Sequence, residues 1–310
     1  MVTPTPPTPA SAPERPRATL GWRAALTALS LLPLGLMSRC AGTLARIPLP
    51  PLLRGPVLGL WARATGVRVE EAEHPLSAYP TVDAFFTRRL RPGLRSWERD
   101  PRVLASPVDG VVGEVGRITG GRLLQAKGRW YSAASLVADP DLAGAFEGGT
   151  FITLYLSPRH YHRVHTPTSG CVVTARRIPG RLFPVHAAAT FEVDHLFARN
   201  ERLVCTLAGP IGSVAVVAVG ALNVGSISVA FDPEWAGPDG RGVTNRFKAL
   251  PLVRRYLDPP RVDRGDELMA FHLGSTVVIL TEPGARIEPG VTPGTEVTVG
   301  RTLMRRPRPQ

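Results

Sequence analysis

Short apolar runs bounded by glycine or proline place the strongest constraint on what this chain can fold into. The runs are rich in valine, isoleucine and threonine, which favour extended strands. They cover residues 150–156, 171–176, 214–219, 226–231 and 276–280. Because each run is apolar throughout, it predicts a strand buried on both faces. The pattern therefore predicts a mainly β (α+β) fold, with packed β-sheets in a sandwich or barrel-like domain.

The composition before residue 76 differs from that of the β-rich remainder. Residues 1–17 are MVTPTPPTPASAPERPR and lack the apolar side chains needed to offset the entropy of ordering. We therefore expect a disordered tail over residues 1–19, a helical region over residues 20–75 and one domain over residues 76–310. At the start of that domain, TVDAFFTRRL predicts a short helix that ends before Pro92-Gly93.

The segment Leu20–Met37 is apolar but short for a membrane span. Its longest uncharged stretch, residues 24–38, is interrupted by Pro33, whereas a spanning helix needs about 20 apolar residues. Apolar residues recur at helical spacing, arginines flank the segment, and a second apolar stretch, LLRGPVLGLWARATG, follows. The pattern predicts helices lying in the membrane interface, with Trp22 and Trp61 at the level of the headgroups.

Two other interpretations of this segment compete with an interfacial helix. A signal peptide is disfavoured because Ser38-Arg39-Cys40-Ala41 is a poor cleavage site. A helical hairpin packed on the protein's own core stays open as an alternative.

The charge distribution favours an anionic partner. The chain has 37 Lys+Arg against 25 Asp+Glu, and its first 68 residues contain Glu14 as their single acidic side chain. Such a balance suits anionic lipid or nucleic acid. Nucleic acid is disfavoured because aromatic residues make up only 6% of the chain and do not alternate with basic ones. The three cysteines are far apart, so neither a disulfide framework nor a zinc ribbon is indicated.

Four segments contain the residue types that chemistry requires. They are SPVDG at 106–110, HYHRVH at 160–165, FARNER at 197–202 and LGST at 273–276. Taken singly each is weak: Asp109-Gly110 is a common turn pair, His165 reads as a surface histidine, and Gly-Ser occurs three times. Arg163, Arg199 and Arg202 are candidate anion ligands, with a structural role favoured for the last two.

Together with FFTRRLRPG at 85–93, these segments resemble the bacterial phosphatidylserine decarboxylase family, whose members are pyruvoyl-dependent, self-processing proenzymes. The resemblance extends over about residues 80–302. Its blocks keep the family's order, and they read LYLSPRHYHRVHTPTSG, LFARNERLVC, VGALNVGSI, RGDEL and FHLGST.

The resemblance implies a cut without hydrolysis between Gly274 and Ser275, which would give a β chain of residues 1–274 and an α chain of residues 275–310. Ser275 Oγ would attack the Gly274 carbonyl and convert the amide into an ester. β-Elimination and hydrolysis would then leave a pyruvoyl group and ammonia. Asp109 and His165 are implied as the charge relay that activates the serine hydroxyl.

The histidines of HYHRVH divide by position. His162 and His165 are three residues apart, so in an extended segment their side chains point to opposite faces. We assign His165 to self-cleavage and His162 to substrate handling, as a candidate for proton transfer; a structural role for His162 stays open. His160 and His162 share a face, but two ligands are too few for a metal site, and we expect no metal.

The resemblance further implies that the covalent pyruvoyl group replaces pyridoxal phosphate and forms a Schiff base with the substrate amine. The implied reaction converts phosphatidylserine to phosphatidylethanolamine and CO2 in phospholipid biosynthesis, which makes the chain a carboxy-lyase. The implied partners are the anionic membrane surface, the α and β chains of one precursor, and a second copy in a homodimer. We expect a peripheral or monotopic protein on the cytoplasmic face of the cell membrane.

Two other functions compete with this one. A soluble amino-acid decarboxylase with the same cofactor would give no reason for the apolar, basic region over residues 20–68. A basic β domain that binds anionic lipid or nucleic acid without catalysis is compatible with the charge alone.

Overall fold

The computed structural model describes residues 34–126, 128–185, 187–222, 226–236, 243–246, 249–272 and 275–308, and the side chains at 187, 188 and 275 lie outside this description. The expected tail over residues 1–19 and most of the segment Leu20–Met37 therefore fall outside the described residues. The prediction of a mainly β fold with packed sheets is confirmed.

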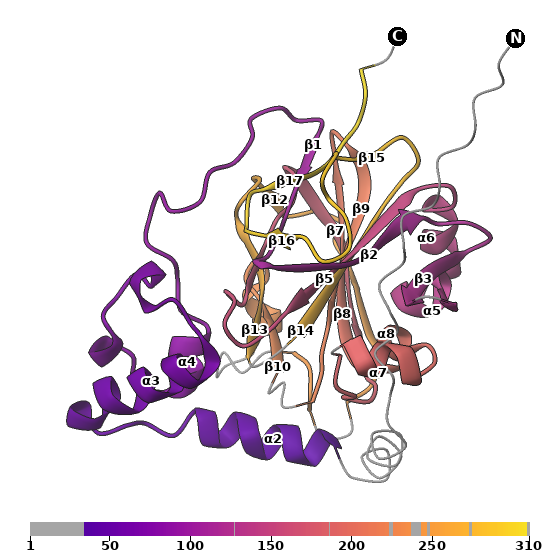
Figure 1. Cartoon of the computed structure of the whole chain (residues 1–310). Coiled ribbons are helices and arrows are strands. Elements are labelled where there is room, and N and C mark those ends of the chain that lie inside the picture. The colour runs from indigo at the N-terminus through magenta and orange to yellow at the C-terminus, as the bar shows by residue number, and fades with distance from the viewer. Residues whose placement is uncertain are drawn as a thin grey trace, which may run out of the picture.

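A nine-stranded antiparallel sheet forms the centre of the molecule (Figure 1). Its strands follow the order β11-β7-β8-β9-β14-β5-β2-β16, and β12 also pairs with β7. Their bounds are β2 Gly110–Arg117, β5 Thr150–Leu156, β7 Gly170–Ile178, β8 Arg202–Gly209, β9 Gly212–Val219, β11 Leu252–Arg255, β12 Arg261–Val262, β14 Ser275–Thr281 and β16 Glu296–Val297. Four of the five predicted strands belong to this sheet, as β5, β7, β9 and β14.

Strand β14 shows why its sequence is apolar at successive positions. Val277 and Ile279 belong to one core cluster, whereas Val278 and Leu280 belong to another. Because neighbouring side chains of a strand point to opposite faces, both faces of β14 are covered. Each fully buried valine, leucine or isoleucine contributes roughly 1.5–3 kcal/mol relative to an exposed one.

Smaller sheets and short helices cover the two faces. One cluster joins the central sheet to a sheet of β10 Ser226–Val229, β13 Glu267–His272 and β6 Arg163–His165, and to another of β1 Val103–Ala105, β17 Thr302–Arg305 and β15 Arg286–Ile287. The opposite face packs against the β3 Arg122–Ala126 and β4 Arg129–Ser132 hairpin and against α5 Ala133–Val137, α6 Pro140–Ala145, α7 Ala187–Glu192 and α8 Leu196–Arg199. Helix α9, Pro233–Ala236, follows β10.

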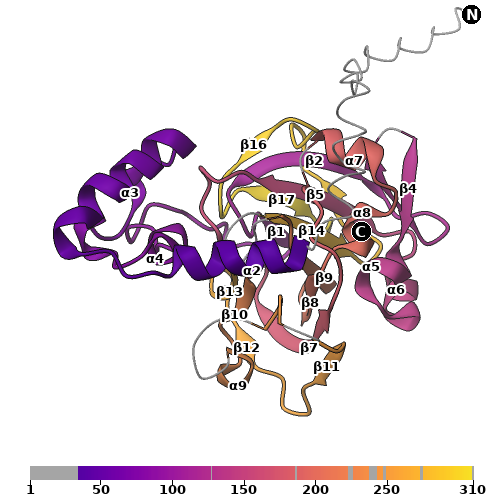
Figure 2. The ribbon, with the colours of Figure 1, turned by 90° about the horizontal axis from the view of Figure 1, so that it is seen from below.

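The N-terminal helices form a helical layer that lies mainly on the side of the sheets away from α5 and α6, although α2 runs beneath the strands and its first residue, Leu34, joins the core cluster of the α5–α8 face (Figures 1 and 2). They are α2 Leu34–Ala45, α3 Pro51–Thr65, η1 Val69–Glu71, η2 Leu76–Ala78 and α4 Val82–Phe86. Their own small core includes Leu58, Tyr79 and Phe85, so it spans the boundary expected at residue 76.

Trp61 contributes to that small core. Its ring lies 5.8 Å from Phe85 and 5.9 Å from Phe86, edge to face. Trp61 is therefore packed on α4, and its expected place at the level of the headgroups stays a prediction. Among the described helices, none is both long and apolar enough to cross a membrane.

Candidate functional site

The bond between Gly274 and Ser275 connects two different sheets. His272 is the last residue of β13, and Ser275 is the first residue of β14, where its backbone pairs with Leu156 of β5. Leu273 and Gly274 lie outside the described residues, as does the side chain of Ser275. Between His272 and Ser275 the chain therefore passes from the three-stranded sheet into the middle of the nine-stranded one.

Strand register places Asp109 near the start of β14. Val111 of β2 pairs with Tyr155, so Gly110 is level with Leu156, which pairs with Ser275. Gly110 and Ser275 are thus two strands apart, or roughly 10 Å at the usual strand spacing. Asp109 directly precedes Gly110 and is buried. Two segments separated by 165 positions in the sequence meet through this register.

The carboxylate of Asp109 is held by an arginine and a backbone amide. Arg95 Nη2 donates to Asp109 Oδ2 at 2.6 Å, and the Val299 N–H donates to Oδ1 at 2.7 Å. The same Arg95 nitrogen donates to Glu71 at 2.9 Å. This network fixes the orientation of Asp109 between β2 and the helical layer.

Both ring nitrogens of His165 have partners. Nδ1 lies 2.6 Å from the Gly265 carbonyl, so it donates its proton there, and Nε2 accepts from the Tyr161 hydroxyl at 2.9 Å. Burial lowers the pKa of His165, against the opposing effects of the Gly265 carbonyl and the negative charges of Glu267 and Asp109. A neutral ring with its lone pair on Nε2 can act as a general base.

Gly265 is required for this arrangement. Its φ of 95° lies in the left-handed region, and a Cβ would come within 2.7 Å of the Trp97 ring. A glycine here lets the backbone turn its carbonyl toward His165 beneath Trp97, whose ring centre is 6.0 Å from that of His165.

The expected contact between Asp109 and His165 is not among the hydrogen bonds of the described residues. Asp109 is bonded to Arg95, and His165 to Gly265 and Tyr161, although Asp109 still acts on His165 through its charge. Since the Ser275 hydroxyl lies outside the description, the three-residue relay stays a prediction.

His162 has a different environment from His165. It is fully buried, and its ring centre lies 3.9 Å from that of Phe86. Neither ring nitrogen has a hydrogen-bond partner within the described part of the chain. Burial, and then the positive charge of Arg88, lower the pKa of His162 well below its ordinary value. His162 is therefore neutral and fully buried, an environment compatible both with proton transfer and with a structural role in the core.

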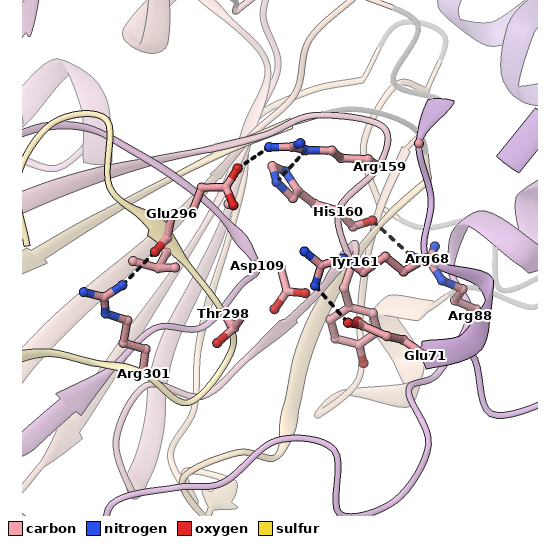
Figure 3. A pocket seen from close by; sticks show the side chains of 13 residues that line it. Arg68, Glu71, Arg88, Asp109, Arg159, His160, Tyr161, Glu296, Thr298 and Arg301 are labelled. Atoms are coloured by element: carbon pink, nitrogen blue, oxygen red, sulfur yellow. Dashed lines mark hydrogen bonds and ion pairs between the residues drawn. The ribbon is translucent and has the colours of Figure 1, made fainter. Parts of the chain in front are cut away.

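A cavity of about 270 Å³ opens between the helical layer and the central sheet (Figure 3). Its walls are Gly66, Arg68, Glu71, Arg88, Asp109, Gly110, Arg159, His160, Tyr161, Glu296, Val297, Thr298 and Arg301. A second cavity of about 350 Å³ contains His165 and Trp97. Tyr161 lines both, so Asp109 and His165 lie on two cavities that share one wall.

His160 serves a local turn in this wall. Its Nδ1 accepts the Ser157 N–H at 2.9 Å, and Arg159 lies beside its other nitrogen at 3.4 Å. Within the described residues, no group of three or more His, Cys, Asp or Glu side chains is arranged to hold a metal.

Sequence reasoning missed a second histidine and carboxylate pair. His272 Nδ1 lies 3.0 Å from each carboxylate oxygen of Asp83, and His272 Nε2 lies 3.2 Å from Ser228 Oγ. Arg46 reaches the same carboxylate at 3.3 Å. Burial raises the pKa of Asp83, but His272 and Arg46 outweigh it and lower that pKa overall. The signal was available, because His272 stands only two residues before the Gly274–Ser275 bond.

The candidate arginines make mainly structural contacts. Arg202 is buried and donates to the backbone carbonyls of Leu136, Ser135 and Ala198. Arg163 pairs with Glu267 at 2.5 Å. The structural role favoured for Arg202 is thus supported by its contacts.

Comparison with known proteins agrees with this picture. Residues 82–305 match the family model described as phosphatidylserine decarboxylase. A phosphatidylserine decarboxylase proenzyme of Anaeromyxobacter sp. (strain K) is 46% identical over 279 residues, which are 90% of this chain and 96% of that protein. Those of Halorhodospira halophila (strain DSM 244 / SL1) and Myxococcus xanthus (strain DK1622) are 42% and 41% identical, over 96% and 82% of this chain and 96% and 88% of theirs.

The chain belongs to the phosphatidylserine decarboxylase family. The matched range begins at α4 and ends at β17, so it contains the residues of both cavities from Arg88 onward, including Asp109 and His165, and the pair of Asp83 and His272. Helices α2 and α3 precede the part that defines the phosphatidylserine decarboxylase family.

Proposed function

We propose that this chain is a self-processing phosphatidylserine decarboxylase that converts phosphatidylserine to phosphatidylethanolamine and CO2 in phospholipid synthesis. The observation that carries the proposal is its identity of 46% to a proenzyme of that name over 90% of the chain. The name proenzyme also implies maturation by processing.

The processing step we propose is the cut between Gly274 and Ser275. Ser275 Oγ attacks the Gly274 carbonyl carbon and passes its proton to a base, which returns a proton to the departing amine nitrogen. The resulting ester loses its Ser275 α-proton and releases the carboxylate of Gly274. Water then replaces the nitrogen of the dehydroalanine, giving a pyruvoyl group and ammonia. Atoms balance with one water consumed.

His165 is the proposed base, because it is neutral and has its lone pair on Nε2. To reach Ser275, Nε2 must exchange the Tyr161 hydroxyl for the serine hydroxyl. Asp109 is the proposed partner that stabilises the ring once it is charged, which requires it to leave Arg95.

The residues around Ser275 suit a pyruvoyl group. Ser275 begins a strand paired on both sides, so a new chain end there stays fixed by the backbone bonds of β14. When present, the group supplies a carbonyl that takes up the substrate amine and accepts the electrons released with CO2. Neutral His162 is the proposed proton donor or acceptor at the substrate carbon.

Intact-mass measurement tests the processing and the cofactor together. We expect two chains, of residues 1–274 and 275–310, with the smaller one blocked at its N-terminus and reducible by borohydride. Ser275→Ala should remain at full length and lack decarboxylation. A wild-type protein that stays as one polypeptide with an intact serine would refute the proposal.

The N-terminal helices support peripheral binding to an anionic membrane. Leu44, Leu52 and Leu60 are 66%, 91% and 68% exposed on or near α2 and α3, in a region otherwise rich in arginine. Exposed leucines beside arginines are typical of surfaces that enter the interface of a bilayer. The cytoplasmic face of the cell membrane and a homodimer are further parts of the proposal, and both rest on the family resemblance.

Vesicle sedimentation tests the membrane part. We expect the double variant Leu52→Asp, Leu60→Asp to lose binding to vesicles that contain phosphatidylglycerol. Leu257→Asp is the matched control, because Leu257 is fully exposed beyond β11. Equal loss in both variants would show that general surface hydrophobicity, and not the helices, drives binding. Analytical ultracentrifugation in detergent tests the homodimer.

A further inference from the structure

Arg88 is a buried arginine without an acidic partner. Only 3% of its surface is exposed, and it makes no ion pair within the described part of the chain. Its Nη2 approaches the backbone carbonyl of His160 at 3.4 Å, and its Nε and Nη1 have no partner among the described residues. Burial lowers the pKa of Arg88 for the same reason that it makes the charge costly.

The carboxylates of the cavity that Arg88 lines are used by other arginines. Asp109 and Glu71 pair with Arg95, and Glu296 pairs with Arg159. The side chain of Arg301, at the other end of the cavity, donates to a backbone carbonyl at 2.7 Å. The cavity thus contains a guanidinium whose positive charge is not neutralised by contact with any described carboxylate.

We propose that Arg88 binds the phosphodiester group of a glycerophospholipid headgroup in this cavity, an inference that rests on the proposed function. A guanidinium presents two parallel N–H donors to two phosphate oxygens. Binding of the headgroup in the cavity that Arg88 lines would bring a negative charge beside its guanidinium and would balance its positive charge.

The phosphate is a better occupant than the serine carboxylate of the same headgroup. A carboxylate that leaves as CO2 loses its charge in the transition state, so an arginine bound to it would stabilise the ground state and slow the reaction. The phosphate keeps its charge throughout. Its binding therefore positions the substrate without opposing decarboxylation.

The location of the cavity allows the phosphate of the headgroup to lie at Arg88 while the amine lies near Ser275. Gly110 in its wall and Ser275 are two strands apart, roughly 10 Å at the usual strand spacing. One end of the headgroup can therefore rest against Arg88 while the amine extends toward the start of β14.

The proposal is tested by measuring the binding of small probes to the self-cleaved protein, with both of its chains present, in detergent. The probes are glycerophosphoethanolamine, which is not decarboxylated, inorganic phosphate, and serine. We expect wild type to bind glycerophosphoethanolamine, and Arg88→Met to bind it about tenfold or more weakly, as loss of a charge-assisted pair predicts. Arg122→Met is the control of equal charge change, because Arg122 is exposed on β3.

Kinetics give the second readout. In Arg88→Met, KM for phosphatidylserine in micelles should rise about tenfold or more while kcat stays within about twofold, which marks lost ground-state binding. Arg88→Lys should recover part of the affinity, because it keeps the positive charge. If the methionine variant does not fold, the lysine variant can be measured in its place.

Each outcome has one meaning. Unchanged binding in Arg88→Met, or a wild type that binds serine but not glycerophosphoethanolamine, overturns the proposal. Inorganic phosphate bound as tightly as glycerophosphoethanolamine shows a site for free phosphate, which also overturns it. A wild type without decarboxylation refutes the proposed function, yet the binding experiment still decides the role of Arg88.

Discussion

His272 and Asp83 are 3.0 Å apart and join the end of β13 to helix α4. The pair is buried, and Arg46 contacts the same carboxylate at 3.3 Å. It therefore links the helical layer to the strand that leads into the proposed cleavage bond. The two residues are 189 positions apart in the sequence. Their contact therefore holds distant parts of the chain together close to the Gly274–Ser275 bond, where backbone geometry affects processing.

Removing the Asp83 charge should slow self-cleavage. In Asp83→Asn the hydrogen bond to His272 loses its charged acceptor, and a hydrogen bond to a charged group is worth roughly 1.5–3 kcal/mol. We expect the unfolding free energy of Asp83→Asn to fall by that order in a Ser275→Ala background. Gel analysis after synthesis should show slower cleavage when Ser275 is present. Asp258→Asn, at an exposed position, is the control.

The two residues should also behave as a unit. If they act together, the unfolding free energy of the double variant Asp83→Asn, His272→Gln is only slightly lower than that of the less stable single variant. Additive losses would show that each residue acts separately.

Tyr161 should set the pH range of self-cleavage. Burial lowers the pKa of His165, and the Tyr161 hydroxyl donates to its Nε2, a hydrogen bond that only the neutral ring can accept. In Tyr161→Phe this pKa should rise, and the loss of cleavage at acid pH should begin at a higher pH. The measurement is the cleavage rate against pH. A variant that fails to cleave at every pH would instead place Tyr161 in the proton path.

His162 should make the fold sensitive to acid. Its folded pKa lies well below the ordinary 6.5, so the stabilisation is present above pH 6.5 and is lost as pH falls. We compare proteins with His162 and with His162→Leu, both in a Ser275→Ala background. Below pH 6.5, the unfolding free energy of the protein with His162 should fall by up to about 1.4 kcal/mol per pH unit relative to the leucine variant. Denaturant unfolding between pH 7 and pH 5 measures the difference.

The control for this prediction is His74→Leu, because the His74 ring is 60% exposed. Parallel stability curves for wild type and His162→Leu would show that His162 becomes protonated without unfolding.

Glu201 should have the opposite pH dependence. Burial raises its pKa to about 6 from 4.5, so its contribution is complete below pH 4.5 and is lost as pH rises through about 6. Glu201→Gln keeps an acceptor for the Asn245 N–H and should be more stable than wild type above pH 6, by about 2 kcal/mol. Thermal unfolding at pH 4.5 and pH 8 checks this, with exposed Glu70→Gln as control.

The strands could be predicted because burial on both faces leaves a local signature. The run at 150–156 coincides with β5, and 276–280 lies inside β14. Pairing order carries no such signature. Nothing in the sequence places β14 between β5 and β9, because register arises from contacts between segments far apart in the chain.

The candidate site was predictable in its residue types but not in its contacts. Asp109 and His165 came from motifs, whereas their partners Arg95 and Tyr161 depend on side-chain packing. The contact of Tyr161 with His165 could have been predicted, because a spacing of four in an extended segment places both side chains on the same face. His272 could have been singled out by its position two residues before the Gly274–Ser275 bond, but its partner Asp83 could not, because the contact joins two elements 189 positions apart.

The central position of β14 has a consequence for the mature enzyme. Residues 275–308 provide β14 at the middle of the large sheet, β16 at its edge and β15 and β17 beside β1. A cut at Gly274–Ser275 would leave a short polypeptide woven through its larger partner by backbone bonds on both sides. Such a subunit could neither exchange between molecules nor dissociate without global unfolding, so maturation would be a one-way event and each enzyme would keep the cofactor it made.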